Sequence, residues 1–163
     1  MFDTYIAHLV DQYRERGVVV DTNLMVLIIV GTYDINKIES FRATRKYSPA
    51  IYNAVIEIVH HFPSRYTTPN IFTEVDNLSK QVDKTEWEAI SFALNTIIAT
   101  LMEVPTPTIH LASHPLHCSV GITDCSILNL AAEGMLVLTD DLPLSSQVRA
   151  MGRDVINVSN LIA

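Results

Sequence analysis

Two short apolar runs, residues 18–20 and 135–138, constrain the fold of this chain most strongly. The first is three valines and the second reads Met-Leu-Val-Leu, so neither alternates between apolar and polar side chains. Strands that are apolar on both faces lie inside parallel sheets, because helices cover both faces of such sheets. Helical patterns separate these runs from two further strand-like runs at 65–68 and 155–158. This alternation predicts a three-layer α/β/α fold around a central parallel sheet.

Helical patterns fill most of the chain between the strands. Residues 2–16 carry an apolar stripe at helical spacing, so we divide the chain into an N-terminal helix, 1–16, and a domain, 17–163, on which it packs. The next helix, 24–30, is expected to close at Gly31. The remaining expectations are helices over 49–61, 84–103, 123–132 and 143–151, another beginning at Pro69, and an irregular stretch or short strand over 108–118.

The composition narrows the class of protein. The formal net charge is −7, from 18 acidic and 11 basic residues, whereas a purely electrostatic nucleic-acid binder carries a basic excess. Two cysteines do not make a disulfide framework and indicate a reduced compartment. The longest apolar run, 24–30, is far shorter than the roughly 20 residues that cross a bilayer, and residues 1–5 lack the basic start of a signal peptide. We therefore expect a cytoplasmic protein with no membrane partner.

Polar side chains follow both apolar runs directly. Asp21 comes after the first run, and Thr139, Asp140 and Asp141 come after the second. The carboxyl ends of parallel strands meet at one edge of a sheet, and ligands of open α/β sheets bind beyond that edge. We therefore expect these side chains to line one cleft.

Two more acids stand in apolar surroundings. Glu74 lies on the helix that begins at Pro69, and Asp124 lies near the start of the apolar helix over 123–132. An unpartnered carboxylate is costly there, and several carboxylates in one cleft repel one another unless a cation offsets their charge. Oxygen ligands suit Mg²⁺ or Mn²⁺ rather than zinc. The expected ligands are Asp21, Glu74, Asp124 and Asp141.

A second set of residues has the side-chain types that bind zinc. Their spacing, His-x3-His-x2-His-Cys-x6-Cys, matches no zinc-finger pattern, and Pro115 would break a helix that aligned the histidines. We therefore interpret them as loop histidines and two core thiols. These residues are His110, His114, His117, Cys118 and Cys125.

Four short motifs occur in order along residues 17–160. They are Asp21-Thr22-Asn23 after the valine strand, Glu74 after Thr-Thr-Pro-Asn, Gly121-Ile122-Thr123-Asp124 before an apolar stretch, and Leu138-Thr139-Asp140-Asp141 at the end of a strand. Each motif alone is common. The ordered set resembles the PIN domain family, which includes the VapC-like metal-dependent ribonucleases of toxin–antitoxin pairs.

The resemblance implies a ribonuclease fold with a central parallel sheet and a catalytic metal site. It assigns catalysis and metal binding to the same four acids. Asp140 is adjacent to Asp141 and could substitute for it or assist it, with one of the two capping the helix that follows. The resemblance also places Asn23 near the site and gives Thr139 a hydroxyl that supports water there.

The reaction that the resemblance implies is hydrolysis of an RNA phosphodiester, leaving a 3′-hydroxyl and a 5′-phosphate. One or two Mg²⁺ ions would lower the pKa of the attacking water and offset charge on the phosphate. Arg42, Arg45 and Lys46 are candidates to hold the RNA backbone, because phosphate contacts need cations and little sequence specificity. The alternative is that these three form a solvated surface.

The runner-up function is a PIN-like module that binds metal or protein with little catalytic activity. An antitoxin-like protein partner and a homodimer stay open under either function, and the apolar stripe of 2–16 is then an alternative docking surface. A phospho-acceptor receiver domain would need an acid pair at the first strand and a Lys after the last strand, and this chain has neither. A phosphatase with an Asp-x-Asp motif is disfavoured because position 23 is Asn.

Overall fold

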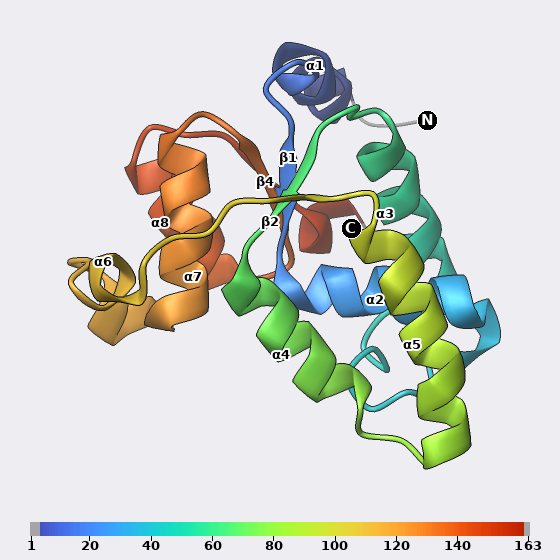
Figure 1. Cartoon of the computed structure of the whole chain (residues 1–163). Helices are drawn as coiled ribbons and strands as arrows, with labels where there is room; N and C mark the ends of the chain where they lie inside the picture. Colours follow the sequence, from blue (N-terminus) through green and yellow to red (C-terminus); the bar gives the residue numbers. More distant parts are fainter. Residues whose placement is uncertain (1–3, 162–163) are drawn as a thin grey trace.

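Five parallel strands form the centre of the computed structural model, which describes residues 4–161 (Figure 1). Their order across the sheet is β3-β2-β1-β4-β5, so the valine strand lies in the middle. Val18 pairs with Leu136 and Val20 with Leu138, and these side chains are almost completely buried. The central parallel sheet is therefore confirmed. The strands are β1 (Val18–Val20), β2 (Arg65–Thr67), β3 (Met102–Glu103), β4 (Leu136–Thr139) and β5 (Val155–Asn157).

Helices cover both faces of the sheet, as the three-layer fold requires. Helices α2, α3 and α5 lie together on one side, and α7 and α8 lie on the other (Figure 1). Helix α4 contacts both α2 and α7. Within residues 4–161, no helix is both long enough and apolar enough to cross a membrane. The helices are α1 (Thr4–Tyr13), α2 (Thr22–Tyr33), α3 (Pro49–His60), α4 (Pro69–Ser79), α5 (Lys84–Ile98), α6 (Thr108–Ala112), α7 (His117–Ala132) and α8 (Leu142–Ala150), with short 3₁₀ turns at Ile35–Lys37 and Val158–Leu161.

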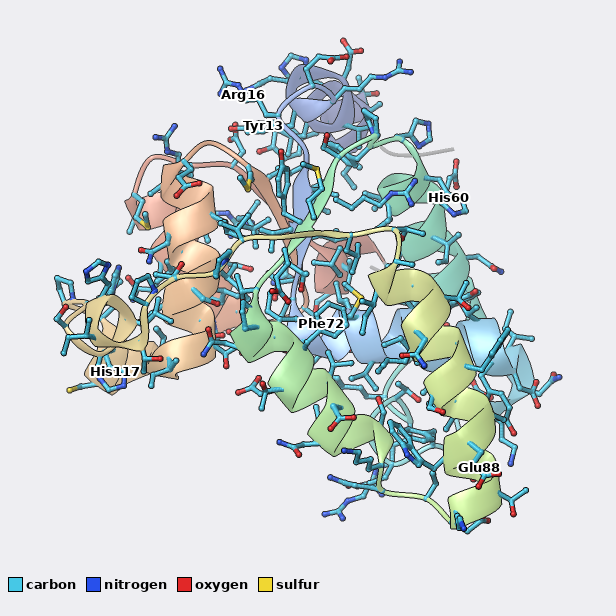
Figure 2. The ribbon with its side chains drawn as sticks, in the orientation of Figure 1. Tyr13, Arg16, His60, Phe72, Glu88 and His117 are labelled. Atoms are coloured by element: carbon cyan, nitrogen blue, oxygen red, sulfur yellow. The ribbon has the colours of Figure 1, made fainter. Side chains whose placement is uncertain are left out.

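The N-terminal helix α1 packs on the rest of the chain. Its residues Ile6, Leu9, Val10 and Tyr13 are buried and belong to the same apolar cluster as the sheet. The Tyr13 hydroxyl donates a hydrogen bond to Asp154 Oδ2 at 2.9 Å, and its ring lies beneath α1 near Arg16 (Figure 2). The expected docking of this helix on the domain is thus seen over 4–13, while Phe2, assigned to the same stripe, lies outside the described residues.

Two expectations about the middle of the chain are wrong. The helix expected over 84–103 ends at Ile98, and residues 102 and 103 form strand β3, where Met102 pairs with Tyr66 of β2. The free edge of β2 supplies this pairing, which no local apolar pattern reveals. Residues 108–118, expected to be irregular or extended, contain the short helix α6 and the start of α7.

Gly31 does not end α2, contrary to the expectation from sequence. The helix continues to Tyr33, and Gly31 is buried inside it. A Cβ atom at this position would lie 2.4 Å from ring carbons of Tyr52 on α3. The glycine therefore serves the close approach of α3 to α2 rather than helix termination.

We expect Gly31→Ala to lower the free energy of unfolding by about 1–3 kcal/mol, because overpacking forces the Tyr52 ring to move. An ordinary helical Gly→Ala substitution would instead stabilise by roughly 0.5–1 kcal/mol. Urea unfolding measures the difference, and adding Tyr52→Ala should make the same Gly31→Ala substitution favourable. A stabilised single variant would contradict this account of the α2–α3 contact.

Candidate metal centre

Asp21 sits at the carboxyl edge of the sheet, where β1 gives way to α2. Its backbone N–H donates to Leu138 O at 2.9 Å, which holds it beside the end of β4. Asp21 occupies the cap position of α2, but its side chain makes no capping hydrogen bond. The carboxylate instead accepts a 2.5 Å hydrogen bond from Thr139 Oγ1, the hydroxyl expected near the site. Two segments 118 residues apart thereby meet at one buried acid.

Glu74 reaches the same region from α4, where it is exposed to solvent rather than enclosed by apolar residues as expected. Thr22 Oγ1 donates to Glu74 Oε2 at 3.1 Å, and Thr123 Oγ1 donates to Glu74 Oε1 at 2.8 Å. These two hydrogen bonds join α4 to the start of α2 and to α7. Both threonines are immediate neighbours of acids, at Asp21-Thr22 and Thr123-Asp124, and that adjacency is the only sequence signal for their role.

Asp124 lies on α7 shortly after a break in the helix. Gly121 has φ 86° and ψ 175°, so the helical path restarts just before Thr123 and Asp124. Burial raises the pKa of Asp124 to about 7, and the charges of Asp21, Asp141 and Glu74 add to this effect. Four acids from distant parts of the chain are therefore close enough to act on one another electrostatically.

Asp21 shares this electrostatic environment. Burial raises its pKa to about 6; the hydrogen bond from Thr139 opposes the rise, whereas the charges of Asp140 and Asp141 reinforce it. A carboxylate with a raised pKa in a buried setting lacks a sufficient compensating charge. The raised pKa values of Asp21 and Asp124 indicate that this edge of the sheet would favour a bound cation.

Asp140 and Asp141 have different partners. Asp141 Oδ1 accepts a 2.6 Å hydrogen bond from Leu144 N and caps α8. Asp140 is contacted by Asn23 Nδ2 at 3.3 Å and forms an ion pair with Lys46 Nζ at 2.5 Å. The sequence favours Asp141 as the ligand and Asp140 as the cap, and the cap assignment is wrong: Asp141 caps α8, although its Oδ2 lies outside that bond. Asp140 is instead neutralised by a lysine.

Lys46 and Tyr47 bring a fifth segment to the site. Of the three basic residues expected to contact RNA, Lys46 is the one that reaches the acids, while Arg42 and Arg45 are exposed on the same segment. The buried Tyr47 hydroxyl lies close enough to the Asp140 carboxylate to interact with it. Burial raises the pKa of this hydroxyl well above the usual range, and the nearby charges of Asp140 and Asp21 add to this effect. Sequence reasoning did not identify Tyr47, because a buried tyrosine is ordinarily a core residue.

The residues at this edge fit a hard divalent cation. The acids and the threonines that contact them offer carboxylate and hydroxyl oxygens, which are the ligands that hard divalent cations prefer. In the described part of the chain, no three His, Cys, Asp or Glu side chains are arranged to enclose a metal ion as they stand. Binding would therefore require these side chains to rearrange. Asp21, Glu74, Asp124 and Asp141 are the residues that could hold the ion.

The histidine and cysteine set makes no cluster of this kind. The expectation of two core thiols is correct for Cys125, which is buried, and wrong for Cys118, which is exposed; neither forms a disulfide. His114 Nδ1 accepts a hydrogen bond from Leu116 N at 3.2 Å, so this ring serves the turn between α6 and α7. Within residues 4–161 these side chains form no group of three that could hold a metal ion.

Comparison with known proteins adds no relative. The sequence matches no protein-family model, and no curated protein matches it. The evidence for the function of this chain is therefore its fold and the acid-rich edge of its sheet.

Proposed function

We propose that this chain is a Mg²⁺- or Mn²⁺-dependent ribonuclease of the PIN type. The observation that carries the proposal is the gathering of acids from four separate segments at the carboxyl edge of a parallel sheet, where burial and mutual repulsion raise the pKa values of Asp21 and Asp124. The raised pKa values mean that the charges of Asp21 and Asp124 are costly in the folded protein, and a divalent ion would relieve that cost. The order of the motifs adds support from resemblance.

A divalent ion bound there would supply water of lowered pKa and would offset negative charge on a phosphodiester. The protein's own residues orient the ligands: Thr139 holds Asp21, and Thr22 with Thr123 hold both oxygens of Glu74. Lys46 has an exposed stem and a cationic head beside Asp140. That head is placed to exchange Asp140 for an RNA phosphate, a contact that requires charge and no base recognition.

A second candidate function is metal or protein binding with little catalysis. One observation favours low catalytic activity. Within the described residues no three of the acids enclose a metal position, and a lysine already pairs with Asp140. Helix α5 also exposes Phe92 and Ile98, which could contact a protein partner such as an antitoxin-like chain or a second copy.

RNA cleavage separates the two candidates. We expect the wild-type chain to cleave single-stranded RNA with Mg²⁺ or Mn²⁺ and to be inactive in EDTA. Asp124→Asn and Glu74→Gln should each lower the rate at least 100-fold, since even the loss of a residue that only supports a metal ligand costs about 10–100-fold. Products carrying a 5′-phosphate are expected.

The matched control is Asp11→Asn, which removes one exposed acid from α1. It should cleave at the wild-type rate. Equal cleavage by all variants would reveal a contaminating nuclease and remove the proposed site. Saturable Mn²⁺ binding without cleavage by the wild-type chain would instead support the second candidate.

A further inference from the structure

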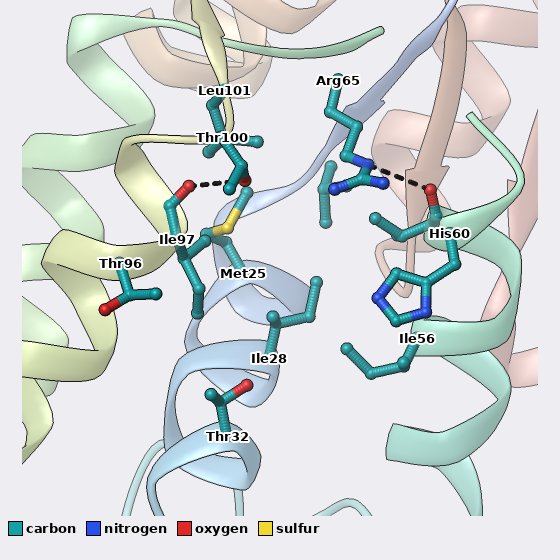
Figure 3. Close-up of a pocket in the computed structure, with 12 residues that line it drawn as sticks. Met25, Ile28, Thr32, Ile56, His60, Arg65, Thr96, Ile97, Thr100 and Leu101 are labelled. Atoms are coloured by element: carbon teal, nitrogen blue, oxygen red, sulfur yellow. Dashed lines mark hydrogen bonds between the residues drawn. The ribbon is translucent and has the colours of Figure 1, made fainter. Parts of the chain in front are cut away.

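A pocket of about 180 Å³ lies between α2, α3 and α5, on the face of the sheet that these helices cover (Figure 3). Its walls are apolar: Met25 and Ile28 come from α2, Ile56 and Val59 from α3, and Ile97 from α5. None of the twelve residues that line it is acidic. A cavity of about 150 Å³ is enough to bind benzene, so this pocket has room for a small apolar molecule.

Arg65 supplies a fixed positive charge at one end of the pocket. It opens β2, and its Nε donates to the backbone oxygens of Val59 at 3.2 Å and Phe62 at 3.1 Å. These bonds hold the guanidinium in place without using its terminal nitrogens, which have no hydrogen-bond or ion-pair partner within residues 4–161. Figure 3 shows the guanidinium and the ring of His60 on the same side of the pocket, across from Thr96 and Ile97.

The other polar groups in the lining are already occupied. Thr96 Oγ1 donates to Phe92 O at 2.9 Å, and Thr100 Oγ1 donates to Ile97 O at 2.8 Å, so both hydroxyls serve their own helical segment. Thr32 Oγ1 lies 3.4 Å from the Tyr52 hydroxyl. The donors left for a ligand are therefore the terminal nitrogens of Arg65 and the ring of His60, gathered at one end of an otherwise apolar space.

We infer that this pocket binds a small apolar monocarboxylate, with its carboxylate against Arg65 and its hydrocarbon body between α2, α3 and α5. The planar fork of a guanidinium matches the two oxygens of a carboxylate. One arginine balances a single negative charge, whereas a phosphate near −2 would demand more cations than the lining offers. The volume suits an aromatic ring or a chain of about six carbons. This inference does not depend on the proposed nuclease activity.

Calorimetric titration of the full chain with benzoate and hexanoate tests the inference. We expect saturable binding of the acids, and binding at least tenfold weaker for benzyl alcohol and 1-hexanol, which have similar bodies and no charge. Arg65→Gln should weaken benzoate binding at least tenfold, whereas Arg149→Gln, which removes an exposed arginine on α8, should leave it unchanged.

Arg65 also braces the end of α3, so a second variant keeps its charge and closes the pocket instead. Ile97→Phe fills the space from α5 and should abolish benzoate binding while the melting temperature stays within a few degrees of wild type. Three results would each overturn the inference: no saturable binding of either acid, equal binding of acids and alcohols, or wild-type affinity in Arg65→Gln. Equal binding of acids and alcohols would mark the pocket as a socket for an apolar side chain.

Discussion

Replacing Asp21 by Asn is expected to abolish metal-dependent RNA cleavage and, at pH 8 without metal, to raise the melting temperature. The amide has nearly the same shape and can still accept the hydrogen bond from Thr139. In the wild-type protein burial raises the pKa of Asp21 to about 6, so at pH 8 the folded state carries a buried charge that the unfolded state leaves in water. The pKa rises from 3.8 to about 6, and each pKa unit corresponds to about 1.4 kcal/mol, so the gain is about 3 kcal/mol, or several degrees.

Thermal unfolding in EDTA at pH 8 and cleavage assays with Mn²⁺ measure the two effects on the same preparation. Asp11→Asn, an exposed acid on α1, should change neither. If Asp21 had only a structural role, replacing it would make the protein less stable. If Asp21 is retained for binding a cation, replacing it should make the metal-free protein more stable. Retained cleavage, or a lower melting temperature at pH 8, would contradict the assignment of Asp21.

We also expect the free energy of unfolding to depend on both pH and bound metal. Asp21 and Asp124 have folded-state pKa values of about 6 and 7, both above the ordinary value of 3.8. Between about pH 4 and pH 7 the folded state therefore binds more protons than the unfolded state. Stability contributed by these two groups is fully present below pH 4 and is lost as the pH rises through 6 and 7.

Millimolar Mn²⁺ should reverse this loss, because a ligand that binds only the folded state stabilises it. The increase in melting temperature should be larger at pH 8 than at pH 5, where protons occupy the carboxylates that the metal needs. The measurement is thermal unfolding across pH 4.5–8 with Mn²⁺ or with EDTA. In the double variant Asp21→Asn, Asp124→Asn, both the metal-free pH dependence over this window and the Mn²⁺ effect should become small. An undiminished Mn²⁺ effect in that variant would place the metal elsewhere.

Elements of this fold were predictable where a few neighbouring residues specify them, and not where they depend on pairing with distant residues. Three consecutive valines can only be buried on both faces, so the central strand and the position of Asp21 were predictable from a few letters. The starts of α3 and α4 were equally local, since a serine or threonine cap stands directly before a proline at each. Strand β3 was not, because it depends on pairing with β2 some 36 positions away, from Tyr66 to Met102.

The candidate site divides in the same way. Its acids could be selected because each follows a strand or stands in an apolar stretch, but their partners could not. The contact of Lys46 with Asp140 joins residues 94 positions apart, and the contacts of Glu74 with Thr22 and Thr123 join residues 52 and 49 apart. Such contacts depend on how the helices pack together. The sequence around a charged or hydroxyl residue therefore does not predict which distant residue it will contact.

The burial of α2 on almost every side has a consequence for engineering. Residues Leu24 to Gly31 are all buried, so this part of the helix has no exposed face where substitutions would be tolerated. Asp21, Thr22 and Asn23 stand at the start of this buried helix, so their side chains cannot be reoriented without changing the core. Changes to the proposed metal site would therefore have to start from α4, where Thr73, Glu74 and Asn77 are exposed.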